Sequence, residues 1–313
     1  MQKYHNLVLD FNNIFWRVMI TSLEKTITCG EHIIYSHSIE NFFDRVKDLK
    51  NKFGYDDSII YFLCDNPESH INIRKVISEG QYKHSREFKN LPKDVYKTMN
   101  IVIDIIKCFS NDFRVVQNEC LEADDLTYPI AQYIQPNKNS KCLFISADLD
   151  WARNIEDNCD WYNFHTIYNS IKFKAKYKFS PKGKTIQLWK ALKGDNSDCI
   201  SNAIPYLPEE ILLHILNNFN DVDDLYANLW DQDYVEKWKV KLKEVEVNVR
   251  MNYQLTDFIL VEEPIENYTI ICKENIKKLE FWFNVFSIDI KHKSLEKENI
   301  PKTFFGRKKY KRI

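Results

Sequence analysis

Aspartates follow several apolar runs of the sequence, and their type and spacing suit metal chemistry. Asp10 ends LVLD, Asp65 ends IIYFLCD, and Asp148 and Asp150 lie at the end of CLFISADLD. If these runs are neighbouring strands of an open α/β sheet, their carboxyl ends meet in one crevice and the acids converge there. Each aspartate could instead cap the next helix, but that alternative explains one such acid better than it explains all of them.

Two further acidic motifs could join this group. ECLEADDL places Glu122, Asp124 and Asp125 at the start of a helical pattern, where a cap alone needs a single acid. ALKGDNSDCI places Asp195 and Asp198 three residues apart, hence on one face if that turn is helical. An Asx turn would account for this last motif if it stood alone.

The charge of such a cluster indicates its chemistry. Clustered carboxylates raise one another's pKa unless cations neutralise them, and oxygen ligands without histidine or cysteine select Mg²⁺ or Mn²⁺. Two such ions about 4 Å apart stabilise the attacking and leaving oxygens of an in-line displacement. The motifs therefore predict metal-assisted hydrolysis of a phosphodiester.

The elements that must position these acids alternate between strands and helices. Apolar runs predict buried strands at 7–9, 58–64, 113–116 and 141–146, and helical patterns occupy 38–53, 95–109 and 126–134. This alternation predicts an α/β domain with a mostly parallel central sheet flanked by helices. After about residue 190 the pattern changes to helices only, and the clearest lie at 221–230, 233–251 and 274–286. We expect a catalytic domain over 1–190 and a helical region over 191–313 that ends in a basic tail.

Composition excludes several other classes of protein. The chain has 313 residues with 44 Lys and Arg against 45 Asp and Glu, and its six glycines never lie within ten residues of each other, which excludes glycine-rich phosphate loops. The eight cysteines never form a CxxC pair, and His32, His37 and His165 lack an HExxH context, so we expect reduced structural thiols and no histidine ligand. Apolar runs are too short for a signal or a membrane span, which predicts a cytoplasmic protein without a membrane partner.

Together and in this order, the acidic motifs resemble those of the 5'-3' exonucleases and flap endonucleases, which have a PIN-like nuclease core. LVLDFNNIFWR resembles the family's opening strand, and FLCDNPESHINIRKVISEGQYKHSR resembles its second strand with the basic helical element that follows. ECLEADDL, ISADLD and LKGDNSD resemble the remaining acidic motifs, and RMNYQLTDFILVEEPI a short later element. The resemblance covers about residues 5–205. Small phage members, including the replication ribonuclease H of T-even phages, are nearest in size.

The resemblance implies a role for each acid. Asp65, Glu122 and Asp124, with Asp10 nearby, correspond to the first metal cluster, and Asp148, Asp150 and Asp195 to the second. Asp125 and Asp198 match additional acids of the bacterial and phage branch, which act through water or at the outer metal. The implied cofactors are two Mg²⁺ or Mn²⁺ ions.

The resemblance also implies a nucleic-acid interface. In the family, the segment that corresponds to residues 66–105 forms an arch or helical gateway over the site. Lys83 and Arg86 would neutralise the scissile phosphate, Tyr82 would stack on an unpaired base, and Arg74 is a further candidate for binding. An ordinary exposed amphipathic helix is the alternative.

A second basic element is IKFKAKYKFSPKGK, which places lysines at alternate positions. Lys172, Lys174, Lys176 and Lys178 alternate with apolar residues, so a period of two predicts a strand with all four lysines on one face. Such a strand could contact a phosphate backbone, or it could be an edge strand that lysines protect from aggregation.

The sequence departs from the family pattern after Asp198. The family continues with a glycine-containing helix-hairpin turn that binds a monovalent cation and duplex phosphates. This chain reads GDNSDCISNAIPYLPEEI, with Cys199 in place of an asparagine and no further glycine in this segment after Gly194. The departure puts the monovalent-cation site in doubt.

These observations favour a Mg²⁺-dependent, structure-selective 5'-3' nuclease, with ribonuclease H activity on RNA primers included, in phage replication or repair. Expected partners are DNA with 5' ends, flaps or RNA/DNA hybrids, with a single-strand-binding protein or sliding clamp as a candidate partner of a monomer. One alternative is a PIN-type ribonuclease for single-stranded RNA, which needs neither Asp125 and Asp198 nor the arch. The other is a non-catalytic nucleic-acid-binding protein on a decayed nuclease fold, although none of the expected acids is missing.

Overall fold

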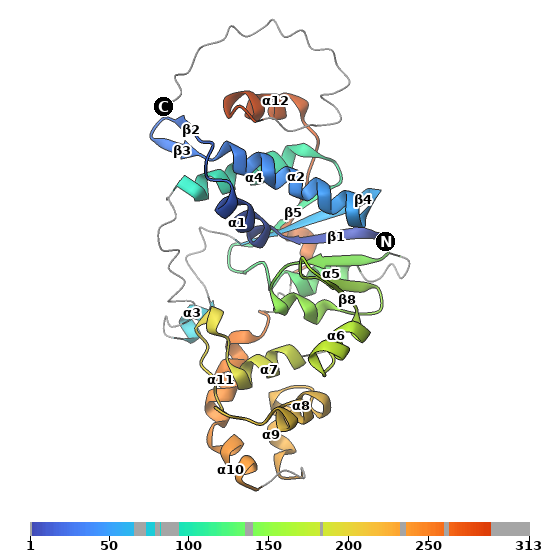
Figure 1. Cartoon of the computed structure of the whole chain (residues 1–313), viewed down its shortest axis with the longest axis vertical. Coiled ribbons are helices and arrows are strands. Elements are labelled where there is room, and N and C mark those ends of the chain that lie inside the picture. The colour runs from blue at the N-terminus through green and yellow to red at the C-terminus, as the bar shows by residue number, and fades with distance from the viewer. Residues whose placement is uncertain are drawn as a thin grey trace, which may run out of the picture.

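A seven-stranded sheet runs through the middle of the molecule (Figure 1). The computed structural model describes residues 2–65, 73–78, 82, 94–134, 140–181, 184–231, 236–259 and 263–288. The strands are β1 (Tyr4–Asp10), β4 (Gly54–Cys64), β5 (Phe113–Gln117), β6 (Cys142–Ile145), β7 (Cys159–Tyr162), β8 (Ile167–Tyr168) and β9 (Thr269–Ile271). Their order is β8-β7-β6-β1-β4-β5-β9, and a separate hairpin pairs β2 (Ile27–Cys29) with β3 (His32–Ile34).

The five central strands are parallel, and only the edge strands β8 and β9 run antiparallel to their neighbours. In the register of the sheet, Leu7 of β1 lies between Ile60 of β4 and Leu143 of β6. The four strands predicted from apolar runs are all present, which confirms the mostly parallel α/β class. Because the central strands share one direction, their carboxyl ends lie along the same edge of the sheet.

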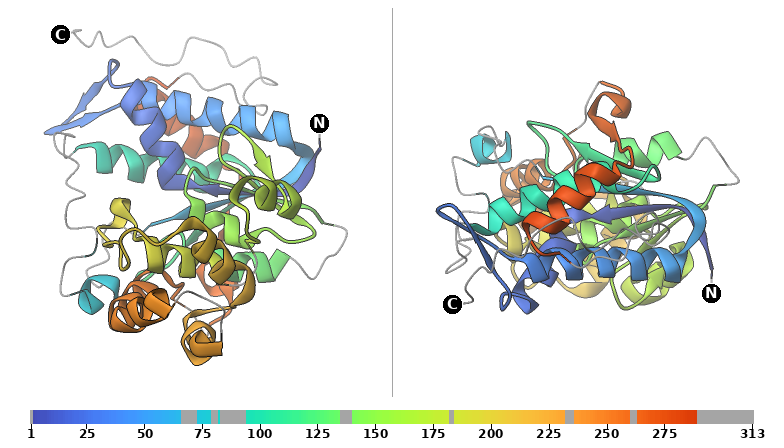
Figure 2. Two further views of the ribbon diagram at one scale, coloured as in Figure 1. Left: turned by 60° about the horizontal axis from the view of Figure 1, so that its bottom comes forward. Right: turned by 90° about the horizontal axis from the view of Figure 1, so that it is seen from above.

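Helices cover both faces of the sheet (Figures 1 and 2). On one face lie α1 (Phe11–Thr21), α2 (Ser36–Phe53), α4 (Asp94–Phe109) and α12 (Ile276–Val285), and on the other α5 (Thr127–Ile134), α6 (Ser170–Tyr177) and α7 (Thr185–Lys193). Leu7 and Leu9 point into the first layer and Val8 into the second. Because both faces are buried, the strands are continuous apolar runs without a polar alternation.

The helical region lies at one end of the molecule, below the sheet in Figure 1. It contains α8 (Glu209–Asn218), α9 (Val222–Ala227), α10 (Glu236–Glu244) and α11 (Glu246–Thr256), and α11 packs against α7 and α9. The chain then returns to the sheet, because β9 pairs with β5 and α12 packs on α4. The expectation of helices alone after residue 190 is therefore wrong at β9, which is too short to show a periodic pattern. The division into domains at 190 stays a prediction.

The segment 170–177 is a helix, so the predicted lysine strand is wrong. Asn169 caps α6 through its side chain, which accepts a hydrogen bond from the Lys172 backbone N–H at 2.9 Å. Phe173 and Tyr177, four residues apart, stack at 4.4 Å between ring centroids on the buried side. In a pattern that alternates every two residues, every second apolar residue is also four residues from the next, which is about one helical turn. The stacking of Phe173 on Tyr177 at this spacing stabilises the helix. All four lysines are exposed, but on two flanks of α6 rather than one strand face.

The cysteines and the lengths of the apolar helices are also the subject of expectations. All eight cysteines are free, and five of them are buried. In the described part of the chain, no helix combines the length and apolar character that crossing a membrane requires.

Candidate metal centre

The predicted acids of three strand ends meet at one edge of the sheet. Asp10 ends β1, Asp65 directly follows β4, and Asp148 and Asp150 follow β6. The Ser146 hydroxyl donates to Asp10 Oδ2 at 2.6 Å, and the side-chain amide of Asn12 donates to Asp65 Oδ2 at 2.8 Å. The convergence of these carboxylates is therefore observed, as the strand ends predict.

Asp10 is nearly inaccessible to solvent, with 7% of its surface exposed. Burial raises the pKa of Asp10 to about 7, and the charges of Asp65 and Asp148 contribute to the rise, although hydrogen bonds from Ser146 and Asn13 oppose it. Asp65 also accepts a hydrogen bond from the Ala123 backbone N–H at 2.7 Å. That contact ties the end of β4 to the turn that carries Glu122 and Asp124.

Asp124, Asp148 and Asp150 form the tightest group of acids. One carboxylate oxygen from each lies within 4.8 Å of the others, and Asp150 is buried. Asp148 caps the short 3₁₀ helix η1 (Leu149–Asn154), and Trp151 of that helix donates from Nε1 to Asp124 Oδ1 at 2.6 Å. Three carboxylate oxygens with no sulfur or imidazole among them suit a hard divalent cation. The group joins Asp124, expected in the first cluster, to Asp148 and Asp150 of the second.

Lys190, which no sequence motif pointed to, lies inside this cluster. Its Nζ lies 2.7 Å from Asp150 Oδ1, 2.7 Å from Asp195 Oδ2 and 3.9 Å from Asp148 Oδ1, and the residue is only 6% exposed. Burial alone would lower the pKa of Lys190, but Asp150, Asp148 and Asp195 raise it above its ordinary value. Lys190 lies on α7, five residues before Asp195, but no feature distinguishes it from the other lysines in the sequence.

Asp195 is held by a tight turn at the end of α7. The turn begins at Gly194, whose φ is +77°, and Asp195 then caps the 3₁₀ helix η2 (Asn196–Asp198) by accepting from the Ser197 N–H at 2.8 Å. Burial would raise the pKa of Asp195, but the Lys190 ammonium and the Ser197 hydrogen bonds outweigh it and lower the pKa.

We expect Gly194→Ala to distort this turn and to reduce any activity that depends on Asp195. A Cβ on Gly194 would lie 2.5 Å from the Ile200 carbonyl oxygen, in a backbone region that costs about 1–3 kcal/mol for other residues. A displacement of about 1 Å near reacting groups can cost about 100-fold in rate. Gly30→Ala is the control, because Gly30 also has a positive φ but has no atom within 4 Å of its Cβ position. Cleavage rates and urea midpoints of both variants check this.

Asp125 is engaged by Arg74 rather than by the other acids, which argues against its predicted metal role. Its side chain is fully buried and accepts hydrogen bonds from Arg74 at 2.5 and 3.0 Å, and from the backbone N–H of Ile259 and of Glu122. Burial alone would lower the pKa of Arg74, but the hydrogen bond and charge of Asp125 raise it. The ion pair between Arg74 and Asp125 therefore accounts for one of the acids in ECLEADDL without a role in metal binding or helix capping.

Arg74 and Tyr82 are also buried, which argues against the predicted contacts with nucleic acid. Arg74 is 4% exposed and donates to the backbone carbonyls of Leu255 and Asp257 as well as to Asp125. Tyr82 is 3% exposed, and its hydroxyl donates to Glu122 Oε2 at 3.2 Å and Asp198 Oδ2 at 3.4 Å.

In this structure these two residues hydrogen-bond to acids, and their contacts with nucleic acid stay a prediction. Asp198 is itself 9% exposed and accepts a hydrogen bond from Tyr82, and its charge contributes to the raised pKa of Asp148. Lys83, Arg86 and most of the predicted arch lie outside the described residues.

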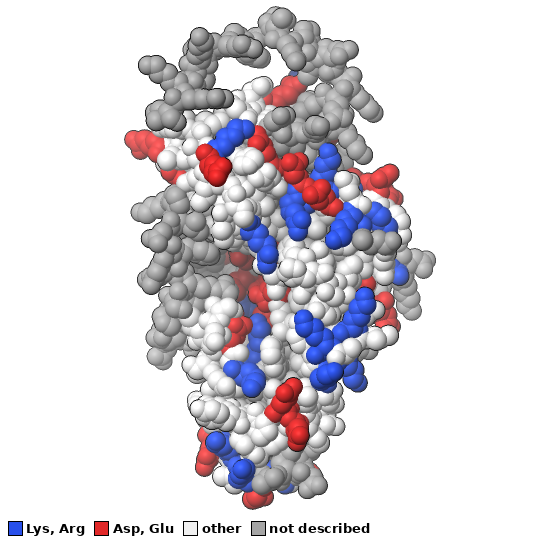
Figure 3. Space-filling model, viewed as in Figure 1, with Lys and Arg blue, Asp and Glu red and all other residues white. Residues whose placement is uncertain are grey.

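A cavity of about 480 Å³ opens beside the acids. Its lining includes Asn13 of α1, Asp148, Lys190 and Asp195. In Figure 3, acidic side chains lie in a hollow between α1 and α7 on the face shown. Phosphate and metal could therefore both reach Asp148 and Asp195 from solvent.

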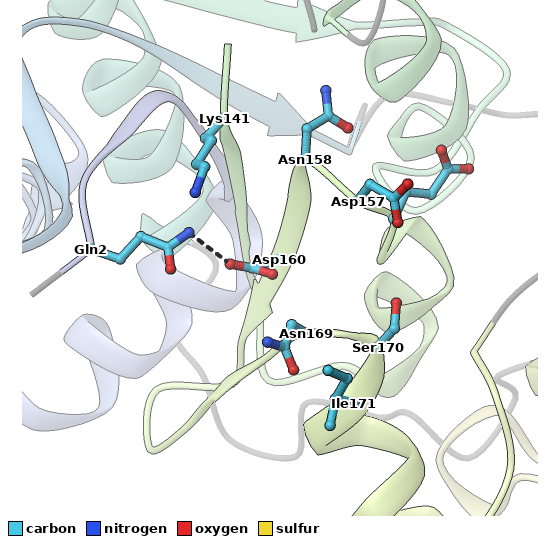
Figure 4. A pocket seen from close by; sticks show the side chains of 9 residues that line it. Gln2, Lys141, Asp157, Asn158, Asp160, Asn169, Ser170 and Ile171 are labelled. Atoms are coloured by element: carbon cyan, nitrogen blue, oxygen red, sulfur yellow. Dashed lines mark hydrogen bonds between the residues drawn. The ribbon is translucent and has the colours of Figure 1, made fainter. Parts of the chain in front are cut away.

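A second cavity of about 290 Å³ lies at the opposite edge of the sheet (Figure 4). Lys141 and Asn158 line it where β6 and β7 begin, and Gln2 donates to Asp160 Oδ2 at 3.3 Å. None of the predicted site residues lines this cavity.

The turn after Asp198 lacks glycine but still adopts left-handed conformations. Cys199 has a φ of 62° and Tyr206 a φ of 63°, values that are unusual for residues with a side chain. The Asn252 side-chain amide of α11 donates to the carbonyls of Ala191 and Ser201, at 3.0 and 2.8 Å. The path of this turn is thus held by α11 rather than by glycines.

Comparisons with solved structures match this fold. The D15 protein of phage T5, crystallised with metal ions, aligns with a TM-score of 0.61 over 82% of this chain and 90% of the other, at 15% identity. The chain shares the fold of this 5'-exonuclease. A zinc-bound T5 5'-exonuclease and a D15 flap endonuclease complex with DNA and metal ions align equally well, each at 16% identity over 82% of this chain and 90% and 89% of theirs.

The comparisons by sequence find no counterpart. No protein-family model matches the chain, and no curated protein matches it. The fold expected from the acidic motifs is therefore confirmed by structure alone, through a PIN-like architecture shared with the T5 enzyme.

Proposed function

We propose that this protein is a divalent-metal-dependent 5' nuclease that hydrolyses phosphodiester bonds in DNA. The observation that carries the proposal is the group of Asp124, Asp148 and Asp150, whose oxygens lie within 4.8 Å of one another at the carboxyl edge of the sheet. The similar T5 proteins of known structure bind divalent metal ions, and one holds DNA.

The residues of the cluster fit two Mg²⁺ or Mn²⁺ ions. Asp10, Asp65, Glu122 and Asp124 would hold the first, and Asp148, Asp150 and Asp195 the second, with Asp124 close enough to serve both. When bound, such ions polarise the phosphoryl oxygens and stabilise the leaving oxygen of an in-line displacement. Asp125 is left out of this ligand set because its side chain is fully buried and both of its oxygens accept from Arg74, and Asp198 because its Oδ2 accepts from Tyr82.

The chain's own groups position the substrate and tune the charge of the cluster. The Lys190 ammonium lies between Asp150 and Asp195 and offsets part of their negative charge. Asn13 and Ser197 line the cavity on either side of Asp148 and Asp195, where they could donate hydrogen bonds to a phosphate. Lys190 therefore bridges the two acids and reduces the repulsion between them.

The substrate class and biological setting extend the same proposal. We expect cleavage of DNA with 5' ends or flaps and of RNA/DNA hybrids, as in primer removal during phage replication or repair, by a cytoplasmic monomer. A single-strand-binding protein or sliding clamp is the candidate partner. The tail with Phe304 and Phe305, which resembles a clamp-binding peptide, lies outside the described residues.

The structure removes one argument against the alternative of a single-strand ribonuclease. Asp125 argued against a PIN-type ribonuclease for single-stranded RNA, but its ion pair with Arg74 gives it a purely structural role. The helical region packed on α7 still favours a duplex substrate, because a single-strand ribonuclease has no need of it.

A panel of 5'-labelled substrates tests the proposal. A flap, a nicked duplex, an RNA/DNA hybrid and a single-stranded RNA are digested in Mg²⁺, Mn²⁺ or EDTA. We expect short 5' products from the first three substrates with either metal and none in EDTA. Cleavage of single-stranded RNA alone would establish the ribonuclease, and binding without any cleavage would establish the non-catalytic alternative.

The exposed lysines of α6 are expected to contact duplex phosphates, now from a helix. Replacing Lys172 and Lys174 with glutamine should weaken binding and reduce the slope of log affinity against log salt by about 0.9 for each lost contact. The charge-preserving Lys→Arg pair is the control and should keep the slope. Fluorescence anisotropy across a salt series measures this, and an unchanged slope in the glutamine pair would leave α6 without a role in binding.

A further inference from the structure

A row of basic side chains leads away from the 480 Å³ cavity along α1 and α2, outside the acid cluster. Asn13 lines the cavity, and Arg17, one turn further along α1, donates from Nε to Asn13 Oδ1 at 3.0 Å. Arg17 is exposed, and its guanidinium carbon lies 4.6 Å from the centre of the Phe164 ring. The row therefore begins at the wall of the proposed active site.

Phe164 fixes the next member of the row. It lies in the loop between β7 and β8 with a φ of 68°, and its carbonyl accepts a hydrogen bond from the Tyr162 hydroxyl at 2.9 Å. The guanidinium carbon of Arg45 on α2 lies 5.8 Å from the centre of the same ring. The Phe164 ring thus contacts two arginines from different helices. The positive φ of Phe164 is a backbone conformation that costs free energy for a residue with a side chain.

Lys52 continues the row two turns further along α2, about 10 Å from Arg45 at 1.5 Å per residue. Its Nζ lies 5.3 Å from the ring centre of Tyr162 and 3.4 Å from the Tyr162 hydroxyl. We call Arg17, Arg45 and Lys52 the basic row.

The charges of the basic row are not neutralised within the described part of the protein. Neither Arg17, Arg45 nor Lys52 forms an ion pair with any described residue, and all three are exposed. Asp44 and Asp48 lie nearby on α2 without pairing to Arg45 among these residues. Figure 3 shows blue side chains spread below α2 on the face that also carries the hollow with the acids.

We infer that the basic row binds the phosphodiester backbone of a nucleic-acid strand that passes the cavity. The inference rests on the proposed function, because it takes the bound polymer to be the substrate. Arginine offers a planar fork of N–H donors to phosphate oxygens. The Phe164 ring already orients Arg17 and Arg45, so these side chains lose little conformational entropy when they bind. The 10 Å step from Arg45 to Lys52 spans about three nucleotide steps of 3.4 Å.

The contact is expected to be independent of base sequence. The Phe164 ring is partly buried, and two guanidiniums lie over it, which leaves less of the ring for stacking on an unpaired base. The row therefore reads charge alone, which distinguishes it from a stacking site.

Binding in Ca²⁺ across a salt series tests the inference with Arg45→Gln and the pair Arg17→Gln/Arg45→Gln. We expect the slope of log affinity against log salt to fall by about 0.9 for the single variant and about 1.8 for the pair on duplex, or by about 0.7 and 1.4 on single strands. Lys47→Gln is the control: Lys47 is exposed on another face of α2 and should leave the slope unchanged. An unchanged slope in the pair, or an equal loss in Lys47→Gln, would overturn the inference.

Two substrate series show which part of the substrate the row holds. One lengthens a single-stranded 5' arm, and the other lengthens the duplex. A loss in the pair variant that grows with either series supports the inference and identifies the strand. A loss that is independent of both lengths contradicts it.

The outcomes for this inference and for the proposed function are separable. If the wild-type protein cleaves and the pair variant keeps the wild-type slope, the inference fails and the function stands. If the row contributes to binding but no substrate is cleaved in Mg²⁺ or Mn²⁺, the function fails and the inference stands.

Discussion

Asp150→Asn is expected to lower the cleavage rate by at least about 100-fold while the protein stays folded. Asp150 is 8% exposed, and its carboxylate shares the tightest acid group with Asp124 and Asp148, so asparagine removes charge where a cation would sit. The same change also removes one of two carboxylates within 2.7 Å of Lys190, so some loss of stability accompanies it. Single-turnover cleavage and circular dichroism measure the two effects.

Asp57→Asn is the matched control for this prediction. Asp57 lies on β4, the strand that Asp65 directly follows. It is exposed near the start of β4, away from the carboxyl edge of the sheet. Its replacement should leave the rate within about twofold, because surface substitutions are mostly silent. Wild-type cleavage by Asp150→Asn would remove Asp150 from the catalytic centre.

Arg74→Met should destabilise the protein by about 3–5 kcal/mol, because it leaves the Asp125 carboxylate buried without a cationic partner. The Asp125 side chain is fully buried, and Arg74 also holds the backbone carbonyls of Leu255 and Asp257 near the end of α11. The double variant Arg74→Met/Asp125→Leu should recover part of the loss, since it removes both charges. Urea denaturation measures both.

An exposed ion pair is the control for Arg74. Arg250 pairs with Asp223, whose side chain is 82% exposed, and such surface pairs contribute about 0–1 kcal/mol. Arg250→Met should therefore have a small effect. A loss below about 1 kcal/mol for Arg74→Met would mean that water reaches Asp125 and would reopen its assignment as a metal ligand.

The parallel sheet and the acids at its edge could be predicted because their signals are local. Apolar runs such as those of β1 and β4 need no knowledge of distant contacts, and parallel strands bring Asp10, Asp65 and Asp148 to one edge. The order of the acidic motifs then sufficed to predict the fold.

The roles of Asp125, Arg74, Tyr82 and Lys190 depend on pairings between distant segments. Asp125 and Arg74 are 51 residues apart, and only the folded chain shows that they neutralise each other. A lysine that is buried among carboxylates has the same local sequence signature as an exposed one, so Lys190 could not be identified. In α6 the lysine alternation matched a strand, but the stacking of Phe173 on Tyr177 and the Asn169 cap stabilise a helix.

Metal add-back to EDTA-treated protein most directly tests whether these acids form a metal-dependent nuclease centre. Single-turnover cleavage of a 5'-labelled flap is followed as Mg²⁺ is returned, for the wild-type protein and for Asp150→Asn. The account predicts no cleavage in EDTA, recovery of the wild-type rate with Mg²⁺, and little recovery in Asp150→Asn at the same concentrations. Cleavage that persists in EDTA, or equal recovery in both proteins, would contradict it.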